Sequence, residues 1–139
     1  MRAIKIDSEN RMISEVEIKD YKDMQSIVNG CICLAFDYPG EKNACYVDDE
    51  GILKNPEFFF AVPYYPQPFA GNGIIVGMGR YGDIKKCQLN IDDVRKEIKF
   101  FTLKEIQHMI SRGSVDYNTY ITTIEGTSIL SKNDLGAFD

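Results

Sequence analysis

One stretch of the chain, from Pro56 to Arg80, restricts the fold more than any other. It reads PEFFFAVPYYPQPFAGNGIIVGMGR and contains four of the five prolines of the protein. Because proline removes a backbone donor and fixes φ, this stretch cannot form a regular helix. It is nevertheless too apolar for an ordinary solvated loop. We therefore expect it to form the functional surface, built from loops and short strands.

Length and hydrophobicity favour one soluble domain. The chain has 139 residues, of which 44% are hydrophobic, enough to bury a core. The first six residues alternate apolar with charged side chains, unlike the apolar centre of a secretory signal peptide. The apolar runs are far shorter than a membrane span. We expect a cytoplasmic protein with no membrane partner.

Net charge argues against a nucleic-acid partner. Acidic residues outnumber basic residues by 21 to 16, which gives a net charge of -5. A chain of this charge is not attracted to a phosphate backbone at long range. The acidic residues are scattered among lysines, which is typical of an ordinary solvated surface.

Local patterns in the first half predict a hairpin, a helix and a second hairpin. Residues 3–6 and 13–18 alternate as strands do. Asp20 is a helix cap, and Gly30 follows where a left-handed residue ends the helix. Apolar residues 31–36 and 44–47 predict two more strands. Pairing that is symmetric about Pro39 would place Cys33 opposite Cys45 as a reduced, buried pair.

Glycines flank the β-branched run Ile74–Val76. The fingerprint of a dinucleotide site needs a strand before its glycines and a helix after them. Here the apolar run lies between two glycine pairs and predicts a strand instead. We expect these glycines at bulges or at close backbone approaches near strand ends.

The second half predicts helices. Asn90 begins one helix, and Thr102 with Glu105 forms a capping box for another. Residues 99–101 either bend the helix or form an edge strand, and the pattern leaves both open. The predicted fold is α+β, a mainly antiparallel sheet with two or three helices. It forms a single domain over residues 1–113, followed by a C-terminal extension over 114–139 that contains an extra strand near 120–124 and a frayed end.

The aromatic part of the central stretch predicts a ligand pocket. Rings on a proline-stiffened loop lose little freedom on binding, so they suit stacking on a flat ligand. A carboxamide then reads the edge of the ligand, and a guanidinium binds its phosphate or carboxylate. The predicted ligand-binding residues are Tyr64, Tyr65, Phe69, Asn72, Arg80 and Tyr81. In the competing interpretation, the rings close a corner of the core or a homo-oligomer interface.

The sequence has no pattern typical of a metal site or of a catalytic nucleophile with its base. The four cysteines lack the paired spacing of structural zinc sites. His108, the one histidine, has no spacing that couples it to a cysteine, and we expect it on a helix surface. No catalytic residue, metal ligand or cofactor is predicted.

The order of these segments resembles a known family. MRAIKIDSENRMISEVEI, a short helix, YVDDEGILKN and PQPFAGNGIIVG follow one another as in the domain-of-unknown-function family DUF3846 of phages, plasmids and their bacterial hosts. VDDEG and AGNGIIVG are the most specific parts of the resemblance, which covers roughly residues 1 to 105. Gly73 replaces a small alanine of the family pattern. The resemblance implies no assigned catalytic residues.

The resemblance implies an accessory protein of a mobile element in a host cytoplasm. The leading hypothesis is a non-enzymatic protein that binds a small nucleotide-like ligand and so sequesters a host immune signal. One alternative is an inhibitor that binds a host defence enzyme through the same aromatic loop. Another is a nucleotide hydrolase that uses Asp48, Asp49 or Asp83. The aromatic surplus also predicts a homo-oligomer.

Overall fold

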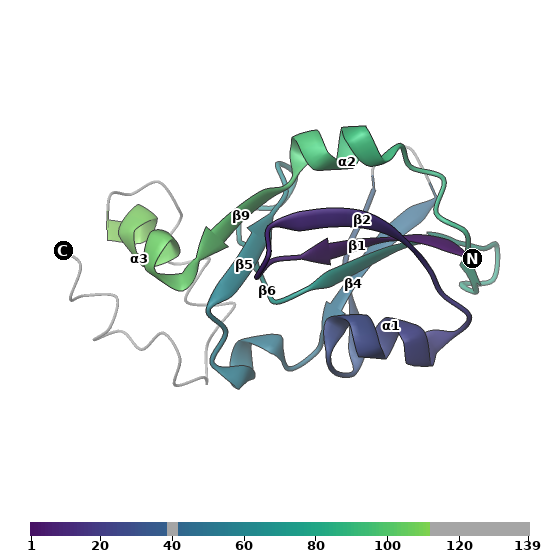
Figure 1. Ribbon diagram of the computed structural model, residues 1–139, viewed down its shortest axis with the longest axis horizontal. Coiled ribbons are helices and arrows are strands. Elements are labelled where there is room, and N and C mark those ends of the chain that lie inside the picture. Colours follow the sequence, from purple (N-terminus) through teal and green to yellow (C-terminus); the bar gives the residue numbers. More distant parts are fainter. Residues whose placement is uncertain (39–41, 112–139) are drawn as a thin grey trace.

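The computed structural model describes residues 1–38 and 42–111. This part forms a single α+β body in which two antiparallel sheets pack with three helices (Figure 1). The predicted fold class is confirmed. The predicted strand near 120–124 and the frayed end lie outside the described residues, so the extension over 114–139 stays a prediction.

The larger sheet has six strands, five of them in the order β2-β1-β7-β4-β3, and β8 pairs with the end of β7. Their bounds are β1 Arg2–Asp7, β2 Met12–Glu17, β3 Ile32–Asp37, β4 Asn43–Asp48, β7 Gly73–Met78 and β8 Ile84–Lys85. The predicted central strand is thus β7, and it is buried from Gly73 to Gly77. A Cβ at Gly77 would collide with the carbonyl group of Lys86. The predicted close backbone approach is confirmed.

The smaller sheet has the order β6-β5-β9. Its strands are β5 Phe58–Ala61, β6 Phe69–Ala70 and β9 Lys99–Thr102. Residues 99–101 therefore form an edge strand, which settles the choice that the sequence left open. Phe59 and Phe60 are buried, at 2% and 0% exposure. Three helical segments also follow β4 in the chain. They are a 3₁₀ helix over Gly51–Lys54, α2 over Ile91–Glu97 and α3 over Leu103–Ser111.

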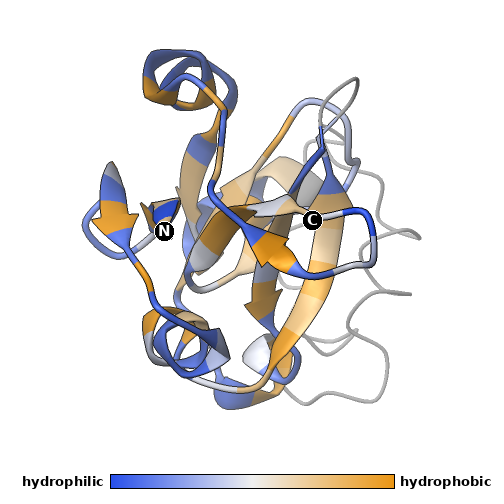
Figure 2. Cartoon of the chain, turned by 90° about the vertical axis from the view of Figure 1, so that its right-hand side faces the viewer, coloured by the Kyte–Doolittle hydropathy of each residue, from blue (hydrophilic) through white to orange (hydrophobic). Residues whose placement is uncertain are grey.

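The two faces of the larger sheet carry separate cores because strand side chains alternate. Ile74 and Val76 of β7 face α1 (Tyr21–Val28), where Met24 is fully buried. Ile75 faces the other way, toward Phe60 of the smaller sheet and Val94 of α2. Figure 2 shows the strands rich in hydrophobic residues and the helices rich in hydrophilic ones. The larger sheet is therefore the middle layer.

The predicted helix starts are confirmed. The Asp20 carboxylate accepts the N–H groups of Lys22 and Asp23, and Asn90 caps α2 in the same way. In the capping box, the N–H of Glu105 donates to Thr102 Oγ1 at 3.2 Å, and the N–H of Thr102 donates to Glu105 Oε1 at 3.1 Å. These signals are local, so the sequence carries them in full.

Two local predictions were wrong. The left-handed residue at the end of α1 is Asn29, with φ 64°, and not Gly30. Gly30 has a different reason to lack a side chain, because a Cβ there would collide with the Asp48 carboxylate. Cys33 lies opposite Val47, and Cys45 lies opposite Phe36. The pairing is not symmetric about Pro39: it is offset by three residues at Phe36 and, beyond the bulge between Leu34 and Phe36, by two residues at Cys33. All four cysteines are free thiols.

Candidate functional site

Five aromatic rings gather where the proline-rich loop meets β3. Phe36 lies at their centre and is 1% exposed. Its ring centroid is 5.5 Å from that of Phe69, 5.8 Å from Tyr65 and 6.1 Å from Tyr64, in tilted arrangements. Tyr38 completes the group, 5.3 Å from Phe36. Such ring pairs are favourable beyond their buried area, so this aromatic cluster fixes the loop against the sheet.

The two predicted tyrosines remain open to solvent. Tyr64 and Tyr65 keep 36% and 39% of their surface exposed. The Tyr64 hydroxyl donates to a carboxylate oxygen of Glu97 on α2. Burial and then this carboxylate raise the pKa of Tyr64. Tyr64 therefore stays a neutral donor that ties the loop to α2, while Tyr65 faces the other side of the loop.

A hollow of about 440 Å³, which we call the aromatic groove, lies between β3 and the end of the loop. Leu34 and Leu53 at its rim are 52% and 59% exposed. Its lining includes the carboxylates of Asp48 and Asp49 and no lysine or arginine. The remaining lining residues are Cys33, Ala35, Val47, Gly51, Ile52, Tyr65, Gln67, Pro68, Phe69 and Ala70.

Beside this groove, the VDDEG motif forms an ion pair and hydrogen bonds that stabilise the fold. Asp48 is 7% exposed at its side chain and forms an ion pair with Lys54 at 2.7 Å. Its other oxygen accepts the N–H of Glu50 at 3.0 Å. Lys54 Nζ also donates to the carbonyl of Asn29 at 2.9 Å. The hydrogen bond to Asp48 raises the pKa of Lys54. The motif thus ties the 3₁₀ helix to the end of α1.

Asn72 is used inside the protein. Its Oδ1 accepts the N–H of Ser8 at 3.1 Å, and its Nδ2 donates to the carbonyl of Ile27 at 3.3 Å. Ser8 is 2% exposed, and its hydroxyl donates to the carbonyl of Gly71. The amide predicted to read a ligand therefore joins the first hairpin to α1.

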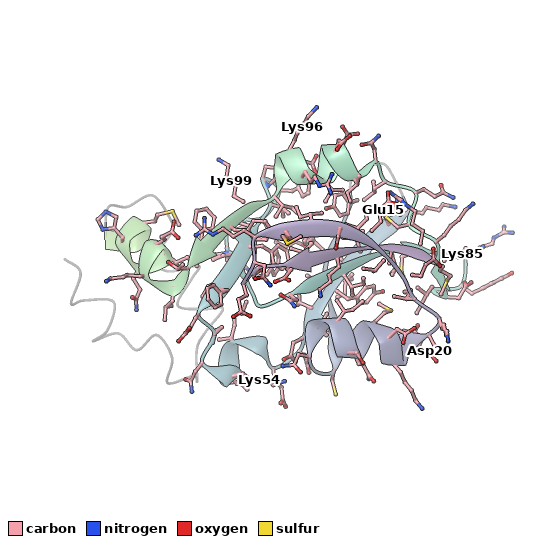
Figure 3. The ribbon with its side chains drawn as sticks, viewed as in Figure 1. Glu15, Asp20, Lys54, Lys85, Lys96 and Lys99 are labelled. Carbon is pink, nitrogen blue, oxygen red and sulfur yellow. The ribbon has the colours of Figure 1, made fainter. Side chains whose placement is uncertain are left out.

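Arg80 and Tyr81 lie in the turn between β7 and β8. Tyr81 is 90% exposed. Asn72 precedes β7 and this turn follows it, so a six-residue strand of roughly 20 Å separates them. Figure 3 shows Lys85, on the strand β8 that follows this turn, at the right-hand side of the view, and Lys54 at its lower edge. The structure brings Tyr64, Tyr65 and Phe69 together, but Asn72, Arg80 and Tyr81 lie elsewhere.

The three aspartates of the hydrolase hypothesis are also apart. Asp48 and Asp49 lie at the end of β4 that faces the start of β7, whereas Asp83 follows the far end of β7. Within residues 1–38 and 42–111, no three His, Cys, Asp or Glu side chains are placed to hold a metal ion. His108 is exposed on α3, as predicted.

Sequence reasoning missed the contribution of β3 to this surface. Leu34 lies inside a run that is apolar throughout, and that run predicts a buried strand. Its exposure follows from the position of β3 at the end of the sheet, which a single sequence does not specify. Phe36 and Tyr38 were likewise not assigned to the pocket, although they carry most of its ring contacts.

The fold and the groove define a small α+β protein with an aromatic hollow on its surface. The family model described as "Domain of unknown function (DUF3846)" matches residues 1–101, so the chain belongs to this family and the predicted resemblance is confirmed. Neither a curated protein nor a solved structure matches the chain. None of the helices in its described part is long and apolar enough to cross a membrane.

Proposed function

We propose that this protein is a non-catalytic accessory protein that binds a partner protein through the aromatic groove. The observation that carries the proposal is that β3, which supplies Cys33, Leu34 and Ala35 to the groove, is an edge strand in the described part of the chain. Among the described residues, β3 pairs with β4 on one side and with no strand on the other. An edge strand presents free backbone N–H and C=O groups to a further strand. The partner therefore supplies an extended segment.

The groove suits the side chains of such a segment. A strand added to β3 projects every second side chain toward the same face, where Tyr65 and Phe69 offer apolar contact. The bulge after Leu34 limits regular pairing to the first residues of β3, so the added strand is short. Affinity then depends on side chains in the groove as much as on backbone hydrogen bonds.

Charge distinguishes this partner from a nucleotide. The groove is lined by two carboxylates, and Lys54 neutralises only Asp48. Asp49 is exposed, and Lys54 does not neutralise its charge. Asp49 therefore attracts a lysine or arginine of the partner and repels a phosphate. Burial of the Cys33 thiol, and next the negative charge of Asp49, raise the pKa of this thiol. Cys33 therefore adds no charge to the groove.

The family resemblance to accessory proteins of phages and plasmids indicates where the partner comes from. We propose that the partner is a host defence enzyme. This protein inhibits the enzyme because the aromatic groove binds a basic, extended segment of it. A nucleotide-like ligand in the groove is less well supported, because the predicted Arg80 lies far from the rings.

Site-specific photocrosslinking tests the proposal. A photoreactive residue is placed at Leu34 and, as a matched control, at Tyr21, which is 52% exposed on α1 and lines neither proposed site. We expect one host protein to crosslink from position 34 and not from position 21. With that protein purified, Asp49→Lys should weaken binding about tenfold or more, because it reverses a complementary charge. Equal crosslinking from both positions, or unchanged affinity of the variant, would contradict the proposal.

A further inference from the structure

A second hollow, of about 420 Å³, lies on the opposite side of the strand order from the aromatic groove. Three segments form it: the start of β2, the helix α2 and the edge strand β9. Its lining residues are Arg11, Met12, Ile13, Arg95, Ile98 and Phe100. We call it the arginine hollow.

The charge of this hollow is unusual for an acidic protein. Its lining has two guanidinium groups and no carboxylate. By contrast, four other hollows in the described part of the chain each include at least one aspartate or glutamate. Lys96 and Lys99, which project outward from α2 and β9 in Figure 3, are not part of this lining. The positive charge that would attract an anion therefore comes from the two guanidinium groups.

Both guanidinium groups are held in place and keep donors for a ligand. Arg95 donates from Nε and Nη2 to the carbonyl of Ile13, at 3.3 and 2.9 Å, and from Nη1 to Asp92 at 3.3 Å. Arg11 donates from Nη2 to Glu105 at 2.8 Å. A guanidinium has five N–H donors. The Arg11–Glu105 pair is about half exposed, and Asp92 of the second pair is 73% exposed. Such exposed pairs contribute little, so an incoming anion competes with them.

The backbone at Arg11 supports a role for its side chain. Arg11 has φ 54°, a left-handed conformation that glycine and asparagine adopt more easily than arginine. Non-glycine residues in this region cluster at functional sites. If the turn required only this backbone conformation, glycine or asparagine would suit the position better than arginine.

The rest of the lining is apolar. Ile13 and Ile98 are 7% and 6% exposed, and the half-buried Phe100 supplies a ring. A flat ligand body can pack on Phe100 while its charged group reaches the guanidinium groups. We propose that the arginine hollow binds a small organic phosphate with a flat ring system, of the mononucleotide class. This site is independent of the aromatic groove and uses none of the six residues that the sequence predicted for a nucleotide.

Isothermal titration calorimetry of the full chain at low ionic strength tests this site. The probes are AMP, inorganic phosphate and adenosine. AMP should bind saturably and more tightly than either of its halves, because only AMP uses both the guanidinium groups and the apolar floor. Arg11→Asn keeps a residue that tolerates the left-handed turn and should weaken AMP binding about tenfold or more. Arg95→Gln should do the same.

Arg80→Ala is the matched control, because Arg80 is an exposed arginine at the far end of β7. Its AMP affinity should equal that of the unaltered protein. Absence of AMP binding at millimolar concentration would overturn the proposal. Unchanged affinity in both Arg11→Asn and Arg95→Gln would overturn it as well, as would loss of binding in Arg80→Ala. Crosslinking from Leu34 should be the same with and without AMP, so failure of either proposal leaves the other standing.

Discussion

Replacement of Asn72 by alanine should destabilise the fold without affecting binding at either proposed surface. The Asn72 amide joins two segments that are far apart in the chain, the first hairpin through Ser8 and α1 through Ile27. Ile27 is in the last turn of α1, where carbonyl groups have no partner within the helix. Alanine removes both hydrogen bonds and introduces no new clash.

The cost can be worked out from the two groups left behind. The N–H of Ser8 belongs to a residue that is 2% exposed, so its loss of a partner costs about 1–3 kcal/mol. The bond to Ile27 is longer, at 3.3 Å, and contributes about 0.5–1 kcal/mol. The expected loss is therefore about 1.5–4 kcal/mol, which for a chain of this size lowers Tm by about 5–16 °C.

Urea and thermal unfolding, followed by circular dichroism, measure this loss. Gln88→Ala is the control, because Gln88 is exposed and a surface change of this kind stays within about 0.5 kcal/mol. The reasoning is refuted if Asn72→Ala unfolds at the same urea concentration as Gln88→Ala. It is also refuted if a stably folded Asn72→Ala protein has lost affinity for AMP or for the crosslinked partner.

Three further predictions concern stability. Gly77→Ala should cost about 3 kcal/mol or prevent folding, because its methyl group would meet the backbone carbonyl of Lys86. Expression and the unfolding midpoint would check this against Gly51→Ala, where the added Cβ makes only ordinary contacts. Phe60→Ala removes a fully buried ring and should cost about 3–5 kcal/mol in urea unfolding. The backbone hydrogen bond from Thr102 lowers the pKa of Glu105. The ionised Glu105 carboxylate therefore stabilises the folded protein above pH 4.5, and this stabilisation is lost as pH falls below that value. Glu105→Gln should therefore be less stable than the unaltered protein at pH 7 and equal to it near pH 3, and an equal gap at both values would contradict this assignment.

Much of the fold could be predicted because its signals are local. Asp20, Asn90 and the Thr102 capping box each act within a few residues, and alternation in the first hairpin specifies its faces. The pairing of β5 with β9 joins residues about forty positions apart, and no local pattern encodes it. The register of β3 on β4 is equally not encoded by a local pattern, which is why Cys33 was assigned the wrong partner.

The candidate site was predicted only in part, for a related reason. Tyr64, Tyr65 and Phe69 come together because they share one short loop. Arg80 was grouped with them because it is near in sequence, but the extended strand β7 carries it away at about 3.3 Å per residue. Arg11 and Arg95, which share a hollow, are more than eighty residues apart and show no common pattern.

The two sequence blocks most specific to the family resemblance both act on the end of α1. In VDDEG, Asp48 orients Lys54 toward the carbonyl of Asn29, and in AGNGIIVG, Asn72 binds the carbonyl of Ile27. Helix carbonyl groups at a C-terminus need such partners, so these blocks serve the fold. The lining of the aromatic groove nevertheless includes Asp48 and Asp49 of the first block and Ala70 of the second, whereas the arginine hollow lies outside both blocks. A match to this family therefore predicts the scaffold and one wall of the groove, whereas Leu34 and Arg11 lie outside the matched blocks. It follows that substitution of Asn72 should change stability with binding intact, and that substitution of Arg11 by asparagine should change binding with stability intact.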